Sequence, residues 1–398
     1  MKRVRIITLI TALITLAAVM GLSNVRIHKD GFDRLRIGYV YVGDESSAYT
    51  YNFLRAQEAV EHKFGDRIVS SVKYNVSEQQ DEIAFRELID EGCGLIISTS
   101  YGFGETAKKL AAEYPEIEFC QATCANANEE PVLPNYHNFM GRIYEGRYIS
   151  GVVAGMKLNE LIEKGDIRAE DASIGYVGAF PYAEVISGYT SFFLGARSVC
   201  PSVTMKVLYT NTWSSFKLEK EAAKRLIDEG CQIISQHSDT AGPAYACEET
   251  DKSVIVYHVG YNRSMIDVAP TTHLVSTRIN WTPYILSATE AVLKGAAIEN
   301  KVKAKIYDKD AVSGFERGWV EMLEINSVAA AKGSKEAAEK LIRQFKAKRM
   351  DVFRGEYTGT NPFDANDLID LSKGYIENKS SSAPTFNYVL DDVITVMK

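Results

Sequence analysis

The chain has 398 residues, which is enough for two domains with sizeable cores. Hydrophobic residues make up 46% of it, an ordinary share for a globular protein. A formal net charge of −7 argues against nucleic acid or an anionic lipid surface as the main partner.

The N-terminus has the pattern of a targeting segment. Lys2, Arg3 and Arg5 precede the uncharged apolar stretch 6–22. A basic flank before a short apolar run is typical of a signal peptide. We expect residues 1–25 to be a signal peptide or an N-terminal membrane anchor. The protein would then be exported, either to the periplasm or to the cell surface with a membrane association.

Strands and helices are expected to alternate after this segment. Short apolar runs predict strands, and apolar residues at helical spacing predict helices. Gly92 is placed to stop the second helix at its C-terminal end. In chain order, we expect a strand over 36–42, a helix over 51–60, a strand over 69–74, a helix over 78–90 and a strand over 95–98.

The same order recurs further along, and the sequence itself repeats. The hexapeptide Leu88–Cys93 returns letter for letter as Leu226–Cys231, 138 residues later. Ile37–Val40 returns as Ile174–Val177, 137 residues later. A repeat of this length is a second copy of a whole lobe rather than a solenoid unit. The second copy predicts elements over 173–177, 185–199, 203–209, 218–229 and 232–236.

These elements predict an α/β fold with two similar lobes. Continuously apolar strands that alternate with helices form buried parallel sheets with helices on both faces. Two such lobes side by side leave a cleft between them, and we expect the functional site there. In open α/β sheets, ligands bind at the carboxyl ends of the strands.

The carboxyl ends of the predicted strands are rich in aromatic, amide and hydroxyl side chains. No lysine or arginine appears among them before Arg263. An anionic ligand would need cationic groups, whereas rings and acceptors suit a flat, uncharged molecule with N–H groups. We expect a nucleobase stacked between rings, with Asp239 or Glu184 accepting from its edge. The candidate residues are Tyr49, Tyr51, Asn52, Tyr101, Phe180, Glu184, Trp213, His237, Asp239, Tyr261 and Asn262.

Several candidates also have a purely structural interpretation. The rings of Tyr101, Phe180 and Tyr261 fit the core of a lobe as well as a ligand contact. Asp239 fits an N-cap of a helix that starts a few residues later. His237 fits a neutral hydrogen-bonding group better than a catalytic base, because no nucleophile or metal cluster accompanies it.

The sequence carries no Walker loop, GxSxG elbow, HExxH motif or CxxC pair. We therefore expect a protein that is not an enzyme, with no catalytic residue, no cofactor and no metal site. The six cysteines permit disulfides in an exported protein. Cys93 and Cys231 lie at equivalent positions before the third strands, and we expect both to be buried free thiols.

Motifs along the chain, several of them at these strand ends, resemble those of the basic membrane protein family. Its members are substrate-binding proteins of ABC transporters that have a type I periplasmic-binding fold and capture nucleosides or purine bases. The resemblance runs from about residue 36 to about residue 295. It is carried by the segments 37–43, 49–51, 144–151, 179–185, 194–199, 211–213, 236–239, 260–262 and 280–281.

The resemblance implies roles for individual residues. Tyr49 and Trp213 would stack on the ligand, while Asp239, Glu184 and Tyr261 would make polar contacts. Trp281 lies in the last matching segment and joins the candidate residues on this basis.

The resemblance also implies where the lobes begin and end. We expect lobe 1 to comprise residues 36–140 plus about 283–310. Lobe 2 would comprise residues 141–282 plus about 311–398. The chain would cross between them three times.

We therefore expect an exported, monomeric solute-binding protein. It would close around a purine nucleoside or nucleobase and deliver it to an ABC permease. One alternative is a binder of another small neutral ligand, such as a sugar or a flavin-like ring, and another is a surface sensor on the same scaffold. A secreted enzyme that processes nucleosides is less favoured, because no Asp-rich motif follows the first strand.

Overall fold

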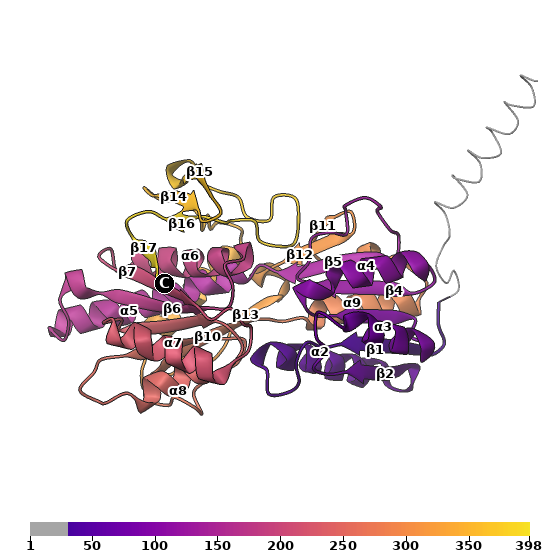
Figure 1. The fold of residues 1–398 in the computed structure, drawn as a ribbon, viewed down its shortest axis with the longest axis horizontal. Coiled ribbons are helices and arrows are strands. Elements are labelled where there is room, and N and C mark those ends of the chain that lie inside the picture. The colour runs from indigo at the N-terminus through magenta and orange to yellow at the C-terminus, as the bar shows by residue number, and fades with distance from the viewer. Residues whose placement is uncertain (1–30) are drawn as a thin grey trace, which may run out of the picture.

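The computed structural model describes residues 31–398, so the export segment expected at 1–25 lies outside the described residues. The described chain forms two α/β lobes joined side by side (Figure 1). Within residues 31–398, no helix combines the length and the apolar character needed to cross a membrane.

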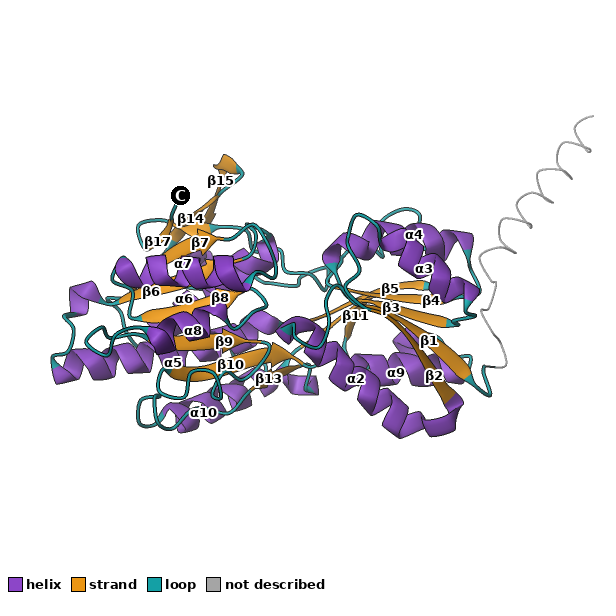
Figure 2. Ribbon diagram, turned by 60° about the horizontal axis from the view of Figure 1, so that its bottom comes forward, coloured by secondary structure: helices purple, strands orange, loops and turns teal. Residues whose placement is uncertain are grey.

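Lobe 1 is built on a seven-stranded sheet in the order β11-β12-β5-β4-β3-β1-β2. Its strands pair in parallel except at the antiparallel edge between β11 and β12. In Figure 2, helices α3 and α4 cover one face of this sheet, and α2 and α9 cover the other. The elements are β1 (Leu35–Val40), α2 (Ala48–Phe64), β2 (Ile68–Lys73), α3 (Asp81–Asp90), β3 (Leu95–Ser98), α4 (Gly104–Glu113), β4 (Glu118–Ala122), β5 (Tyr136–Gly141), α9 (Thr282–Leu293), β11 (Lys305–Tyr307) and β12 (Asp310–Ser313).

Lobe 2 repeats this plan with the order β13-β10-β9-β8-β6-β7-β17. Along β6, Tyr176 joins the core shared with α5 and α6, while Val177 joins the separate core under α7. Helices therefore cover both faces of the sheet, which is why its strands are apolar throughout. The elements are α5 (Ile143–Lys164), β6 (Ser173–Gly178), α6 (Ala183–Arg197), β7 (Thr204–Tyr209), α7 (Phe216–Asp228), β8 (Ile233–His237), α8 (Gly242–Glu249), β9 (Tyr257–Tyr261), β10 (His273–Ile279), β13 (Val320–Met322), α10 (Ser334–Lys346) and β17 (Ile394–Val396).

Within each lobe, the two segments that repeat in the sequence pack against each other. A side chain at Gly38 of β1 would meet Leu88 of α3 at 3.0 Å and Cys93 at 3.2 Å. The equivalent Gly175 of β6 faces Leu226 of α7 at 2.8 Å. Close helix-to-strand packing therefore requires glycine in both lobes. Within the described chain, all six cysteines are buried and free, including Cys93 and Cys231.

The chain passes between the two sheets at three places: between β5 and α5, between β10 and α9, and between β12 and β13. Arg142, in the first crossing, makes ion pairs of 2.6 Å with both Glu145 and Glu316. The buried carboxylate of Glu145 also accepts from the backbone N–H of Phe315 at 2.9 Å. The first and third crossings are thus bound to each other.

The C-terminal residues form a small antiparallel sheet of β14 (Thr358–Asn361), β15 (Asp364–Asp370) and β16 (Val389–Leu390) on lobe 2 (yellow in Figure 1). Residues 377–387, which we name the C-terminal strap, contact both lobes. Glu377 accepts from Ser187 of α6 at 3.0 Å. The backbone N–H of Ser382 donates to Asp310 of β12 at 2.7 Å. The strap is therefore an additional link between the lobes.

Candidate functional site

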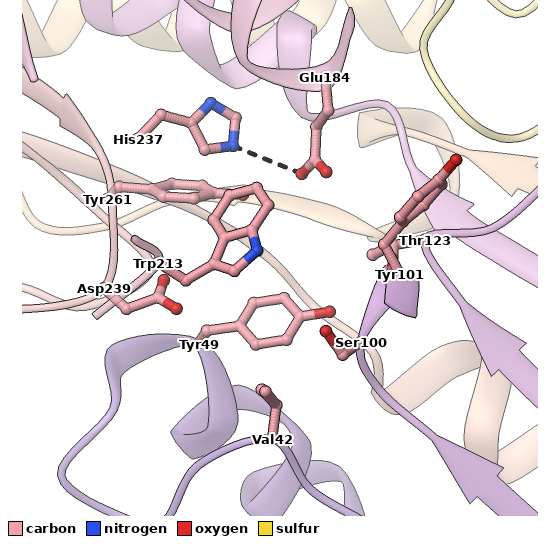
Figure 3. Close-up of a pocket in the computed structure, with 10 residues that line it drawn as sticks. All are labelled: Val42, Tyr49, Ser100, Tyr101, Thr123, Glu184, Trp213, His237, Asp239 and Tyr261. Atoms are coloured by element: carbon pink, nitrogen blue, oxygen red, sulfur yellow. Dashed lines mark hydrogen bonds and ion pairs between the residues drawn. The ribbon is translucent and has the colours of Figure 1, made fainter. Parts of the chain in front are cut away.

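An inner cavity lies between the carboxyl ends of the strands of the two lobes (Figure 3). It measures about 40 Å³, so the lobes stand close together around it. Among residues 31–398, neither a lysine nor an arginine lines it. Lobe 1 contributes Val42, Tyr49, Ser100, Tyr101 and Thr123, and lobe 2 contributes Glu184, Trp213, His237, Asp239 and Tyr261.

Tyr49 forms the lobe 1 wall of this cavity from the first turn of α2. The helix starts early enough to place it there because Ser47 caps it, accepting from the N–H of Thr50 at 3.3 Å. The Tyr49 hydroxyl donates to the backbone carbonyl of Thr99. Its ring packs edge-on against Phe53, with centroids 5.2 Å apart. The ring is therefore held at both ends.

Trp213 forms the opposing aromatic wall in lobe 2. Its ring packs edge-on against Phe180, with centroids 5.4 Å apart, and lies 6.1 Å from Tyr182. Phe180 and Tyr182 are stacked on each other at 5.1 Å. Phe180 does not line the inner cavity; it supports Trp213.

Asp239 points its carboxylate toward the space beside Trp213 and Tyr49 (Figure 3). Only 8% of the residue is exposed, and within residues 31–398 no hydrogen bond to its carboxylate contributes to its pKa. Burial, together with the charges of Glu219 and Glu184, raises the pKa of Asp239 well above its usual range. A carboxylate that lines the cavity and accepts from no donor of the described chain can accept from N–H groups of a ligand.

The structure rules out the helix-capping interpretation of Asp239. Helix α8 starts at Gly242, its N-cap residue is Ala241, and no side chain caps it there. The hydroxyl of Thr240, not the Asp239 carboxylate, accepts from the Gly242 N–H at 3.1 Å.

His237 and Glu184 point toward each other across one side of the cavity (Figure 3). The Nε2 atom of His237 lies 3.4 Å from Glu184 Oε1. Burial and the nearby charge of Arg147 lower the pKa of His237 to about 4. The imidazole is therefore neutral at pH 7 and suits hydrogen bonding. Its buried Nδ1 atom has no partner within the described chain.

Arg147 is a buried cation that the sequence analysis missed. It extends from α5 and is fully buried, with its guanidinium carbon 3.7 Å from the ring centroid of Tyr261. Its Nη1 donates to the carbonyl of Gln236 at 2.8 Å. Arg147 was missed because the candidates were sought at the ends of strands, whereas Arg147 lies in a helix. The sequence did offer one signal: Arg147 is a charged residue within the matching segment 144–151, between the apolar residues Ile143 and Ile149.

Five of the candidate residues lie outside the lining of the inner cavity: Phe180, described above, and the four that follow. Asn52 and Asn262 join the lobes, since the Asn52 amide donates to the Asn262 carbonyl at 2.9 Å. Trp281 is 1% exposed and stacks on Phe53 at 4.5 Å, beneath Tyr49. Tyr51 lies under the guanidinium of Arg263 at 4.9 Å.

Three residues that line the cavity were not among the candidates: Val42, Ser100 and Thr123. Their short side chains carry no distinctive sequence signal. Within residues 31–398, no group of three histidine, cysteine or acidic side chains is arranged to hold a metal ion.

The fold and the cleft define a two-lobed solute-binding protein. The chain belongs to the family described as ABC transporter substrate-binding protein, PnrA-like, whose family model matches residues 42–344. Proteins of this family bind substrates for transport.

Two curated relatives and one solved structure illustrate the similarity. A purine-binding protein of Brucella abortus is 32% identical over 66% of this chain and 70% of its own length. A protein of Haloferax volcanii named as an ABC transporter glucose-binding protein is 30% identical over 66% of this chain and 62% of its own length. A solute-binding protein of an ABC transporter system from Conexibacter woesei has a TM-score of 0.61 at 17% identity, over 79% of this chain and 97% of that chain.

Proposed function

We propose that this protein captures a purine nucleoside or nucleobase in the inner cavity and delivers it to an ABC permease without transforming it. The observation that carries the proposal is the arrangement of Tyr49, Trp213 and Asp239. Two aromatic walls from different lobes flank a buried carboxylate that lacks a partner. Rings stack on a flat base, and the carboxylate accepts from its N–H groups.

The lining of the cavity supports a neutral ligand. Asp239 and Glu184 repel anions, and no lysine or arginine lines the cavity to attract them. Arg147 does not line the cavity; its guanidinium lies over the ring of Tyr261 and donates to the Gln236 carbonyl. The purine-binding relative from Brucella abortus is consistent with this ligand class.

The proposed mechanism is closure of the lobes about the hinge crossings. The N–H of Ala48 in lobe 1 donates to the Asp239 carbonyl in lobe 2 at 3.3 Å, and Asn52 donates to Asn262 at 2.9 Å. These bonds exist only when the lobes are together. A ligand that contacts Tyr49 and Trp213 at once therefore favours the closed state. Because the inner cavity is small, a ring enters only when the lobes separate.

The test is calorimetry with adenine, guanine, hypoxanthine and their nucleosides, and with glucose as the alternative ligand. Binding of a purine and not of glucose supports the proposal. Binding of glucose alone would favour the sugar-binding alternative, which is suggested by the name of the relative from Haloferax volcanii. Chromatography of the nucleosides after incubation tests the non-enzyme proposal, since any turnover contradicts it.

We also propose that the chain is exported through its N-terminal segment and acts as a monomer. The basic residues and apolar stretch at residues 2–22 support export. Cell fractionation, followed by N-terminal sequencing of the mature chain, distinguishes a cleaved signal peptide from a retained anchor.

A further inference from the structure

A second, larger cavity opens beside the inner one. It measures about 710 Å³ and shares Tyr101, Thr123, Glu184 and Trp213 with the inner cavity. The two cavities therefore adjoin at these four residues, and a ligand held between Tyr49 and Trp213 lies next to the outer cavity. Its size is within the range of small-molecule sites.

The C-terminal strap supplies a third wall of the outer cavity, together with Phe363. These residues lie beyond position 344, where the match to the family ends. The strap is anchored there by Ser382, whose hydroxyl donates to the Cys124 carbonyl at 3.3 Å. The Asn378 amide also donates to the Ser382 carbonyl at 2.6 Å. This wall is thus an ordered addition to the part of the fold that matches the family.

The outer cavity is acidic. Glu105, Glu129 and Glu184 line it, and no lysine or arginine of the described chain does. The nearby ammonium of Lys108 is not part of the lining and donates to the backbone carbonyls of Asn126 and Glu129 at 2.7 Å each. A cleft lined by charges of one sign concentrates the opposite charge.

Exposed aromatic rings line the same cavity. Tyr101 is 61% exposed, Tyr182 is 46% exposed and Phe363 is 67% exposed. The rings of Tyr101 and Tyr182 have centroids 6.1 Å apart, one from each lobe. Aromatic faces beside carboxylates attract cations, through the ring quadrupole as well as through charge.

We propose that the outer cavity is a subsite for a positively charged group, such as an ammonium, carried by the ligand whose ring occupies the inner cavity. This inference rests on the proposed function, because the ring must lie between Tyr49 and Trp213. The carboxylates that attract an ammonium repel a phosphate, so the subsite discriminates against nucleotides.

The experiment compares three ligands that differ at one position: adenosine, 5′-amino-5′-deoxyadenosine and adenosine 5′-monophosphate. We expect calorimetry to give the amine about fivefold tighter binding than adenosine, a modest cation–π and charge contribution. The monophosphate should bind at least about fivefold more weakly than adenosine. Equal affinities for the amine and adenosine would overturn the subsite while leaving the proposed function intact.

Substitutions locate the effect. Glu129→Gln and Glu105→Gln should remove most of the advantage of the amine and leave adenosine binding unchanged. Glu116→Gln is the matched control, because Glu116 is exposed on lobe 1 outside the cavity and its loss changes the net charge equally. An equal loss in all three variants would show a general charge effect and contradict the subsite.

A further pair of probes covers the case in which no adenosine compound binds, which would contradict the proposed function. Phenethylamine and 2-phenylethanol carry the same ring and differ in an ammonium against a hydroxyl. Tighter binding of phenethylamine, lost in Glu129→Gln, would support the cationic subsite with a different ring. Equal binding, or binding of neither, would overturn it.

Discussion

Arg147 lies over the ring of Tyr261, with its guanidinium carbon 3.7 Å from the ring centroid. The buried charge thus stands behind a ring that lines the inner cavity. His237 packs against the same ring at 4.7 Å, and Arg147 helps to keep its imidazole neutral. Burial is the main cause of the low His237 pKa, and one buried cation that does not line the cavity lowers it further.

Replacing Arg147 should change the titration of His237. In Arg147→Met, we expect the pKa of His237 to rise from about 4 toward its ordinary value of 6.5, because the nearby positive charge is gone while burial remains. NMR of the imidazole protons measures this shift. Arg197→Met, outside both cavities, is the control. An unchanged His237 pKa in Arg147→Met would contradict the electrostatic link.

Trp213 should contribute directly to ligand affinity. Stacking of a base on an aromatic side chain is worth about 1–3 kcal/mol by alanine substitution, so Trp213→Ala should weaken purine binding by that amount. Calorimetry measures the loss. Phe216→Ala removes an exposed aromatic outside the inner cavity and should leave the affinity unchanged. Equal effects of the two substitutions would exclude Trp213 from the site.

Asp239 should link ligand binding to pH. Its raised pKa means that protonation competes with hydrogen bonds from the ligand, so we expect affinity to fall as pH falls through that pKa. Asp239→Asn should lower affinity by about 1 kcal/mol or more and remove this pH dependence. Calorimetry at several pH values tests both. A variant that keeps the pH dependence would assign it to another group.

The same substitution should not destabilise the ligand-free protein. A carboxyl group whose folded pKa is raised contributes stability at low pH that is lost as pH rises through the folded value. Asparagine has no such loss, so Asp239→Asn should gain stability relative to the native chain at higher pH. A lower melting temperature without ligand would indicate a structural role instead.

His137 should govern stability at alkaline pH. Burial alone would lower its pKa, but ion pairs with Glu118 at 2.8 Å and Glu299 at 2.7 Å raise it to about 9. Its contribution to the free energy of unfolding is fully present below 6.5 and is lost as pH rises through about 9. Burial alone would raise the pKa of Glu299, but the hydrogen bond to His137 lowers it to about 2. The contribution of Glu299 to the free energy of unfolding is therefore present above pH 4.5 and is lost as pH falls through about 2.

Both contributions are therefore complete between about pH 4.5 and 6.5. In that window, His137→Gln should lower the free energy of unfolding by roughly 3 kcal/mol, the lower end for breaking a buried ion pair. Urea denaturation from pH 5 to pH 10 measures the difference, which should shrink at the alkaline end. A difference that is constant with pH would show that packing, not charge, accounts for the loss.

The α/β fold with two similar lobes could be predicted because its signals are local. The apolar strands and the repeated Leu88–Cys93 segment correspond to a helix, its stop at Gly92 and the entry to β3. Helix boundaries were less predictable. The helix expected from residue 51 starts at Ala48 because Ser47 caps it, and the one expected from residue 78 starts at Asp81 because Gln80 closes a turn on Ser77 at 3.0 Å.

The site was predictable where residues follow strands and unpredictable where distant segments meet. Tyr49, Trp213 and Asp239 follow strand ends and line the cavity, although their contact with a ligand remains a prediction. Arg147 reaches the site from a helix, and Ser382 reaches the cleft from a strap near the C-terminus. Such arrangements depend on tertiary packing, which no periodicity in the sequence encodes.

The central claim is that a purine occupies the space between Tyr49 and Trp213. Mass spectrometry of the small molecules released on denaturing freshly purified protein tests it most directly. We expect a purine nucleoside or nucleobase, present in native protein and depleted in Trp213→Ala. Recovery of a sugar or another compound without a purine ring, equally present in both proteins, would contradict it.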